Sequence, residues 1–312
     1  MNVLPFIMVL LGAILWGTTG TAQTYLPESV HPMTVGTFRL AGGGLILLIA
    51  ALSMRQVSFR DWAWGPTIVA AVAMAAFQPF FFGSVRLTGV ALGTVTGIGS
   101  APVFAGLLDW VLLKRRPSKK WVAATVLAIT GCALLLLTGD DVSVNPAGIA
   151  LALGAGLTFA IYSMTSKTVL EFSEPSAAVG VIFTISSILL APVLFIFPLE
   201  GVATREGASV ILYIAVAATA VAYFLYSSGL KALPASTAVT LALAEPLTAA
   251  VLGVLIVGER LGFFAWTGVG LILAGLIVLA VGGKVKSKEE KQIERLRNGI
   301  ERTKELDRDI RP

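Results

Sequence analysis

The chain has 312 residues, of which 56% are hydrophobic and only 13% are charged. Soluble domains carry roughly 25% charged residues, so this composition excludes an ordinary soluble protein and predicts an all-α integral membrane protein. The net charge of +5 does not indicate a nucleic-acid partner, because the Lys and Arg residues gather in segment 113–120 and in the last 29 residues and form no basic face with aromatic residues.

Ten segments are long and apolar enough to cross a bilayer, which takes about 20 residues per helix. They are residues 4–25, 33–53, 63–83, 88–112, 121–138, 146–167, 176–198, 208–230, 234–257 and 263–282. Polar or turn-forming stretches separate most of them, but only Arg86 and nearby glycines mark the junction between the third and the fourth. Because no connecting stretch is long enough for a soluble domain, we expect the function to lie in or across the membrane.

The first segment, MNVLPFIMVLLGAILWG, has no basic leader and no small-residue cleavage site behind it, so we expect a retained spanning helix. With the N-terminus inside, nine Lys or Arg residues fall in the inner loops: Arg55, Arg60, Lys114, Arg115, Arg116, Lys119, Lys120, Lys167 and Lys231. The outer loops carry three, Arg86, Arg205 and Arg260. The positive-inside rule therefore predicts that both termini are cytoplasmic.

Aromatic and amide residues at mid-span positions are the candidates for a substrate cavity: Trp16, Gln78, Phe82, Phe159, Tyr162 and Tyr223. Gln78 stands out because an amide in the middle of a spanning helix needs a hydrogen-bonding partner, and Phe82 follows one turn later on the same face. For the aromatic residues, ordinary packing in the core or against lipid is the alternative. The glycines at 89, 93 and 97 recur at four-residue intervals and predict close approach of another helix.

Three charged residues, Arg39, Asp109 and Glu245, lie inside apolar segments. An ionised side chain at a helix centre costs about 2.5–3.5 kcal/mol on insertion scales, so Glu245 is expected to face protein or a watery cavity. It is either a partner for a proton or a substrate ammonium group, or a neutral, hydrogen-bonded structural residue. Arg39 is expected to pair with a substrate carboxylate or a protein carboxylate, or to extend to the membrane surface. We expect Asp109 to be an interfacial residue.

Three prolines, Pro79, Pro102 and Pro246, fall within predicted spans. Each removes a backbone donor and disturbs the preceding turn, which predicts bends or hinges. The one cysteine, Cys132, cannot form an intramolecular disulfide and is most simply a small core residue.

The chain repeats itself over about 144 residues. The stretch from Gly97 parallels the stretch from Leu241, with Pro102 aligned to Pro246, a polar hairpin and then a Trp in each. We therefore expect two repeats of five helices each, residues 1–140 and 141–283, followed by a charged cytoplasmic tail, 284–312. Since five is an odd number, the repeats must cross the membrane with opposite orientation, an arrangement that is typical of secondary transporters.

The segments ILWGTTGTAQTYL, TVGTFRLAGGGLIL, AEPLTAAVLGVLIVGERL and WTGVGLILAGLIVL resemble the drug/metabolite transporter superfamily, in particular its EamA-type ten-helix carriers. The resemblance covers about residues 4–282. It implies export of amino acids or other small metabolites across the inner membrane of a bacterium. The first repeat departs from the pattern, because Ala101 precedes Pro102 where the second repeat has Glu245, and Arg115-Arg116 stands where it has Glu259-Arg260.

Other function classes fit poorly. No GxxxxGK[ST] loop for ATP occurs. The lone His31 and the lone mid-span Asp109 cannot supply a zinc or a two-aspartate protease centre, so we expect no enzyme activity, no metal and no cofactor. A passive channel would need rings of charges or of carbonyl groups. A secondary carrier working by alternating access remains, with proton coupling through Glu245 and facilitated diffusion both open.

The substrate is expected to be a small molecule. An apolar, aromatic lining with few fixed charges suits neutral or zwitterionic molecules, and the resemblance favours amino acids, including aromatic ones. Amphipathic cations and drugs are the alternative. We expect a monomer or homodimer surrounded by lipid. The tail, with Ile293, Leu296 and Ile300 at helical spacing, is either a short amphipathic helix or a solvated extension.

Overall fold

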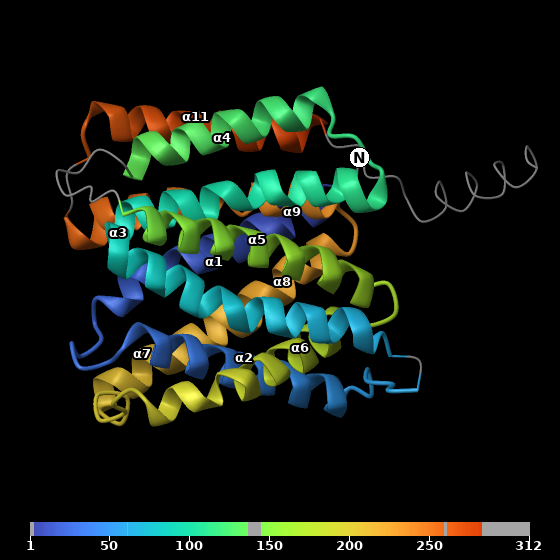
Figure 1. Cartoon of the computed structure of the whole chain (residues 1–312), viewed down its shortest axis with the longest axis vertical. Helices are drawn as coiled ribbons and strands as arrows, with labels where there is room; N and C mark the ends of the chain where they lie inside the picture. Colours follow the sequence, from blue (N-terminus) through green and yellow to red (C-terminus); the bar gives the residue numbers. More distant parts are fainter. Residues whose placement is uncertain (1–2, 61, 137–144, 259–260, 283–312) are drawn as a thin grey trace, which may run out of the picture.

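The computed structural model describes residues 3–60, 62–136, 145–258 and 261–282, and every regular element in these ranges is helical (Figure 1). The elements are α1 (Leu4–Gln23), α2 (Pro32–Ser53), α3 (Trp64–Leu113), α4 (Lys119–Leu136), α5 (Pro146–Val169), α6 (Pro175–Leu190), η1 (Ala191–Phe195), α7 (Arg205–Ala215), η2 (Val216–Val221), α8 (Ala222–Leu230), α9 (Ala235–Leu241), α10 (Ala244–Leu252), η3 (Gly253–Val257) and α11 (Phe263–Gly282). The predicted all-helical class is confirmed.

Nine segments within the described residues are long and apolar enough to cross a membrane. They coincide with nine of the ten predicted spans. The predicted span 121–138 overlaps α4, which is not among the nine and reaches the edge of the described ranges. The number ten therefore stays a prediction. The predicted tail, 284–312, and the Glu259-Arg260 pair lie outside the described residues.

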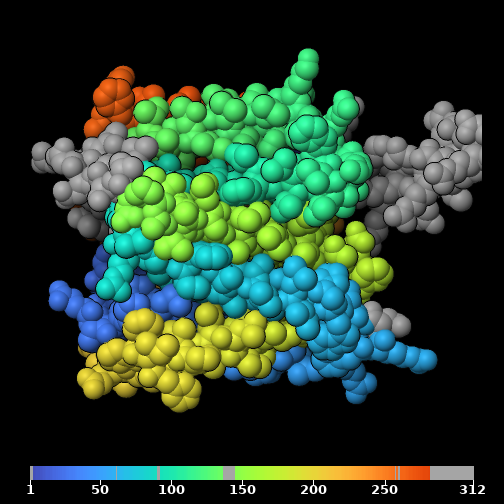
Figure 2. Space-filling view, in the orientation of Figure 1, coloured from blue at the N-terminus to red at the C-terminus, as the bar shows by residue number. Residues whose placement is uncertain are grey.

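The helices lie side by side, with α4 and α11 at one edge of the bundle and α2, α6 and α7 at the other (Figure 1). Helix α1 begins and α11 ends at the same end of the bundle (Figure 1), which we call the terminal end. On the face seen in Figure 2, α3, α5 and α6 lie against one another without an opening between them.

The junction between the third and fourth spans differs from the expectation. Instead of a loop at 84–87, the helix continues through Arg86 to Gly89, whose φ of +81° is the left-handed conformation that glycine adopts without strain. The chain reverses there, and Gly93 packs against Val85, whose Cα would lie 3.0 Å from a Cβ at Gly93. Gly89 is thus the turn residue, not part of a packing stripe, and no polar loop is needed.

Glycines allow the closest helix contacts. A Cβ at Gly131 of α4 would lie 2.6 Å from the carbonyl oxygen of Gly268 in α11, and one at Gly275 would lie 2.7 Å from the carbonyl oxygen of Ala124. As the position advances along α4 it moves back along α11, so the two helices run antiparallel. Small residues at such crossings let backbones approach closely, which is the main source of helix association where lipid removes the hydrophobic drive.

At the end of the bundle opposite the termini, His31 caps α2. Its Nδ1 accepts a hydrogen bond from the backbone N–H of Met33 at 3.2 Å, and its ring stacks on Phe197 with centroids 3.7 Å apart. Burial and the positive charge of Arg86 lower the pKa of His31 below its ordinary value of 6.5. The neutral imidazole is therefore the form that the fold favours.

We predict that Gly268→Ala lowers the free energy of unfolding by about 1–3 kcal/mol, the usual cost of forcing extra volume into a packed contact. Its new methyl group would lie 2.5 Å from the Gly131 carbonyl oxygen. Gly270→Ala in the same helix is the matched control, because nothing lies within 4 Å of its Cβ position. It should be neutral or slightly stabilising. Thermal unfolding in detergent micelles measures both, and equal effects would contradict the packing described.

We predict that acid weakens the α2 cap. Because the pKa of His31 is lower in the folded than in the unfolded protein, its contribution is complete above pH 6.5 and is lost as the pH falls through the lowered value. The loss should be no more than about 1 kcal/mol, typical of a cap. His31→Asn keeps an acceptor oxygen but does not titrate, so its melting temperature should fall less between pH 7 and pH 5. Parallel curves for the two proteins would refute the assignment.

Candidate functional site

The centre of the bundle holds a cluster of aromatic rings from α1, α5, α6 and α8. Trp16 is its hub, with ring centroids 4.6 Å from Tyr223, 5.0 Å from Tyr226 and 6.0 Å from Phe159. Tyr162 lies 6.0 Å from Phe159 and 5.9 Å from Tyr223. Four of the six predicted cavity residues therefore meet at one place, although they come from three helices far apart in the sequence.

Two further rings belong to this cluster and were not predicted. Phe183 of α6 lies 4.6 Å from Tyr223, and Tyr226 donates or accepts a 2.8 Å hydrogen bond with Ser163. Tyr226 follows Tyr223 at helical spacing, so the sequence carried a signal for it. Phe183 sits in an uninterrupted apolar run, where nothing distinguishes it from lipid-facing residues.

Gln78 and Phe82 of α3 lie beside this cluster, against α2. Gln78 is fully buried, and its Oε1 would lie 2.7 Å from a Cβ at Gly36; the ring of Phe82 would lie 3.3 Å away. Neither amide atom of Gln78 has a hydrogen-bond partner among the described residues. Phe82 connects to Phe159 only through the rings of Phe81 and Phe77.

Arg39 of α2 is half-buried. It lies one turn from Gly36, which packs on Gln78, and one turn from Gly43, which packs on Thr219 of η2. The Nε atom of Arg39 is buried and has no hydrogen-bond partner among the described residues. Which of the predicted alternatives Arg39 follows stays a prediction.

Glu245 of α10 packs with its backbone against α1. A Cβ at Gly17, the residue after Trp16, would lie 2.6 Å from the Glu245 carbonyl oxygen. The side chain of Glu245 is partly exposed, although Leu243, Ala244 and Pro246 around it are buried. Within the described ranges no ion pair within 4 Å joins it to Arg39. The two opposite charges therefore do not form a direct pair in the part of the chain that the structure describes.

Several polar atoms around this place lack hydrogen-bond partners in the part of the chain that the structure describes. They include Trp16 Nε1, Arg39 Nε, both amide atoms of Gln78 and Thr219 Oγ1. Buried polar groups are nearly always paired, and an unpaired one costs about 1–3 kcal/mol. Such a concentration is typical of a site that a polar ligand or water completes. We call the surroundings of these residues and Glu245 the central site.

The backbone is irregular at the central site. Helix α9 ends at Leu241 and α10 begins at Ala244, and the turn between them is tightened by a 2.9 Å bond from the Glu245 N–H to the Ala242 carbonyl. Pro246 has no N–H to continue an α-helical pattern. Thr219 lies in the π-helical turn η2, a rare form that is frequent at functional sites. Interrupted spanning helices commonly hold transporter substrates.

The other two prolines leave α3 helical. Pro79 and Pro102 lie inside it, and Gly89 is its one residue with non-helical φ and ψ. A hinge role for any of the three prolines stays a prediction.

Two hydrogen bonds anchor α9 to the rest of the bundle. Asp109, which we expected at the membrane interface, is buried and accepts a 3.2 Å bond from the backbone N–H of Ser236 in the first turn of α9. Thr125 of α4 bonds Thr240 at 3.1 Å. The carboxylate satisfies an N–H that has no partner within its own helix, which the spacing of Asp109 in the sequence could not indicate.

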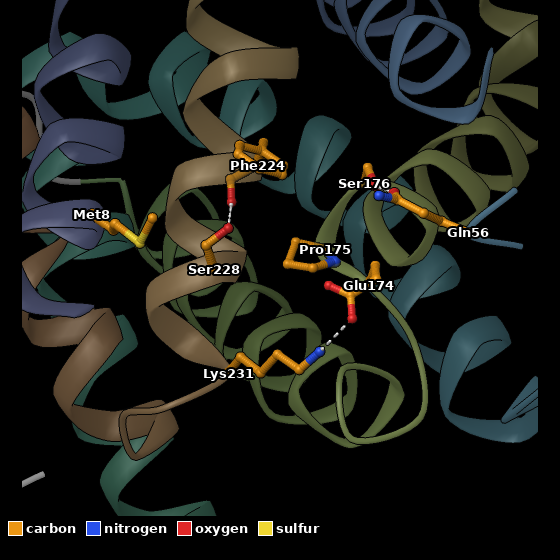
Figure 3. Close-up of a pocket in the computed structure, with 8 residues that line it drawn as sticks. All are labelled: Met8, Gln56, Glu174, Pro175, Ser176, Phe224, Ser228 and Lys231. Atoms are coloured by element: carbon orange, nitrogen blue, oxygen red, sulfur yellow. Dashed lines mark hydrogen bonds and ion pairs between the residues drawn. The ribbon is translucent and has the colours of Figure 1, made fainter. Parts of the chain in front are cut away.

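A pocket of about 320 Å³ lies at the terminal end between α1, α6 and α8 (Figure 3). Lys231 Nζ lies 3.4 Å from Glu174 Oε1 across it, and Ser176 donates a 2.5 Å bond to Gln56 Oε1. None of the predicted site residues lines it. Nearby, Lys167 Nζ donates to the carbonyl oxygens of Leu230 and Leu233 at the end of α8. This end of the bundle is tied together by polar contacts.

Among the described residues no three His, Cys, Asp or Glu side chains gather where they could hold a metal ion. Cys132 is buried and free.

Comparison with known proteins identifies the chain's relatives. A model of the EamA-like transporter family matches residues 3–137 and 146–281. The uncharacterized transporter YwfM of Bacillus subtilis (strain 168) is 45% identical over 284 residues, covering 91% of this chain and 96% of that protein. The threonine/homoserine exporter RhtA of Escherichia coli (strain K12) is 32% identical over 305 residues, covering 94% and 95%.

A solved crystal structure shares the fold. It superimposes with a TM-score of 0.77 at 18% sequence identity and covers 88% of this chain and 95% of the other. The family resemblance expected from the sequence is therefore confirmed, and the helical arrangement has a known counterpart.

We predict that Gln78→Leu leaves the protein as stable or makes it about 1 kcal/mol more stable, because it removes a desolvated amide without breaking a hydrogen bond. Gln56→Leu is the matched control and should be destabilising, because Gln56 accepts a bond from Ser176. Thermal unfolding of the purified variants measures both. A large loss of stability in Gln78→Leu would mean that its amide is paired.

Proposed function

The chain belongs to the EamA-like transporter family, and from this premise we propose that it exports amino acids and related small metabolites across the bacterial inner membrane by alternating access. The observation that carries the proposal is the central site, where aromatic rings, unpaired polar atoms and two separated charges meet in mid-bundle. Apolar lining with a few fixed polar groups is the usual make-up of a small-molecule site. The relative RhtA, an exporter of threonine and homoserine, supports amino acids as the class.

We propose further that ten spans form two inverted five-helix repeats, residues 1–140 and 141–283. The family model matches residues 3–137 and 146–281, which supports two equivalent halves. The helix contacts support it too. In the alignment of the halves, Gly131 corresponds to Gly275 and Ala124 to Gly268, and the contact of Gly131 with Gly268 is repeated by that of Gly275 with Ala124.

In each half, a glycine of another helix also contacts the residue that precedes the aligned proline, Pro102 or Pro246. Gly17 of α1 packs on Glu245, and Gly156 of α5 packs on Ala101, the residue that occupies the position of Glu245 in the first half. Because Ala101 stands where the second half has Glu245, the proposed site holds one carboxyl group where full symmetry would place two. The site is therefore asymmetric, although the helix contacts around it are repeated.

Alternating access requires that each end of the bundle can open. We propose that the terminal end is cytoplasmic, in keeping with the basic residues expected there. Its contacts, Lys231 with Glu174, Ser176 with Gln56 and Lys167 with the end of α8, would then hold the cytoplasmic entrance closed and would break when that entrance opens.

A second candidate function, efflux of amphipathic cations, is favoured by one observation. The Glu245 backbone packs against Gly17, the residue after Trp16, whose ring contacts that of Tyr223, and aromatic faces with a nearby carboxylate attract organic cations. Arg39 in the same site opposes it, because a fixed positive charge repels a cation that has no carboxylate.

Counterflow in proteoliposomes tests the proposal. We predict saturable exchange of at least one neutral or aromatic amino acid. Trp16→Ala should reduce its rate at least tenfold, because it removes the hub of the ring cluster, whereas Trp266→Ala, on the exposed face of α11, should not. Runs with and without an imposed pH gradient distinguish proton coupling from facilitated exchange. Exchange of organic cations alone would favour the second candidate, and no exchange of either class would refute the proposal.

A further inference from the structure

We propose that the pocket drawn in Figure 3, which we call the terminal pocket, binds a phospholipid whose head group carries a primary ammonium group, such as phosphatidylethanolamine. The lipid phosphate binds at Lys231, the ammonium group binds at Glu174, and the start of an acyl chain lies against Phe224 and Met8. This site is separate from the central site, and the inference goes beyond the proposed function.

The terminal pocket opens away from the central site. Phe224, Ser228 and Lys231 follow one another at helical spacing on α8 and all line the pocket (Figure 3). Tyr223 and Tyr226 occupy another face of the same helix and are buried in the ring cluster. Phe224 and Lys231 are exposed. The face of α8 that lines the pocket is therefore an outer face of the bundle.

Helix α1 brings lipid to the mouth of the pocket. Met8 lines the pocket, and Leu4 and Leu11, each one turn from it on the same helix, are exposed. Apolar side chains that are exposed on a spanning helix lie against acyl chains, because exposure to water would be costly. The lipid-facing stripe of α1 thus continues into the terminal pocket.

The polarity of the pocket changes with depth in the way that an amphiphile requires. Lys231 caps the end of α8, and Phe224 lies roughly 10 Å deeper at 1.5 Å per residue. Since the polar region on each side of a bilayer is about 5–8 Å thick, this distance crosses from the head groups into the acyl chains. Charged groups lie at the helix end, Ser228 lies between, and the apolar Phe224 and Met8 are deepest.

The two charges in the pocket select the head group. Lys231 Nζ lies 3.4 Å from Glu174 Oε1 and 3.1 Å from the Ser173 carbonyl oxygen. The side chains of Lys231 and Glu174 are 35% and 57% exposed, so both are accessible to a ligand. A purely anionic head group gains at Lys231 but is repelled by Glu174. A zwitterionic one matches both, and an ammonium group donates the charge-assisted hydrogen bonds that choline cannot.

The size of the pocket and its place in the fold agree with this ligand. About 320 Å³ is within the range of small-molecule sites and accommodates a head group. Glu174 precedes the first turn of α6, whereas Lys231 follows the last turn of α8. A lipid held by both residues therefore bridges α6 and α8 and adds to the contact that the two side chains already make.

Native mass spectrometry of the full-length protein tests the preference. The protein in detergent is given equal amounts of dioleoyl phosphatidylethanolamine, phosphatidylcholine and phosphatidylglycerol. We expect the ethanolamine lipid to be retained about threefold more than either of the others, the scale of an exposed charge pair. Equal retention of all three would overturn the proposal. Glycerophosphoethanolamine, which has the head group without the chains, should not displace the lipid at equal concentration, and displacement would overturn the choice of a lipid.

Charge variants assign the ends of the head group. Glu174→Gln should remove the preference for ethanolamine over choline, and Lys231→Gln should lower the retention of all three lipids about threefold. Arg205→Gln and Glu206→Gln, both exposed at the start of α7, are the matched controls and should keep the wild-type pattern. An ethanolamine preference that survives Glu174→Gln would contradict the assignment.

A third variant tests the location without changing a charge. Ser228→Phe fills the pocket between its charged and apolar parts, and Ser228 donates its hydrogen bond within its own helix, to the Phe224 carbonyl. Retention of the ethanolamine lipid should fall to that of the choline lipid. Unchanged retention would place the lipid elsewhere and overturn the proposal. If a variant does not fold, the wild-type preference still decides, and none of these outcomes bears on amino-acid exchange at the central site.

Discussion

Polar groups inside a lipid bilayer have no water to bond with, and the structure of this transporter follows from that constraint. In most of the bundle the constraint is met locally. Thr37, Thr184 and Thr267 each donate a hydroxyl hydrogen bond to the carbonyl one turn earlier in their own helices. At the central site it is not met, and amide, indole and hydroxyl groups stand unpaired. Because several such unpaired groups gather there, the central site is the place in the described structure where a polar ligand would gain most hydrogen bonds.

The frame around this place is built from glycines. Where α4 meets α11, and where α1 meets α8 and α10, a missing side chain brings one backbone onto another. Such contacts are specific in position and rigid, because added volume has nowhere to go. The frame therefore keeps Arg39, Trp16 and Glu245 at fixed separations. In this protein, close packing and chemical selectivity are two results of the same small residues.

Much of this was readable from the sequence, for identifiable reasons. The spans follow from apolar length, and Glu245, Arg39 and Gln78 stand out because polar residues are costly in apolar segments. Trp16, Phe159, Tyr162 and Tyr223 could be selected as bulky mid-span residues, but only the fold shows that they meet. Phe183 carried no signal, since a phenylalanine among apolar residues looks the same whether it faces lipid or a cavity.

The remaining differences concern single backbone and capping events. The reversal at Gly89 replaces a predicted loop, because one glycine with positive φ can turn the chain where a polar segment was expected. The role of Asp109 depends on a partner, Ser236, that lies in the other half of the chain. Hydrogen bonds between residues far apart in the sequence cannot be predicted from local patterns, whereas helices can.

Helix α9 has a mechanical consequence for Glu245. The hydrogen bonds of Asp109 with Ser236 and of Thr125 with Thr240 hold this short helix near both of its ends. The turn at residues 242–243 follows directly. We therefore expect a displacement of α10 to bend the chain at residues 242–243 and to leave α9 in place. Asp109 and Thr125, which hold α9, come from the proposed first repeat, whereas Glu245 lies in the second. A shift between the two repeats would therefore change the position of the Glu245 carboxyl group.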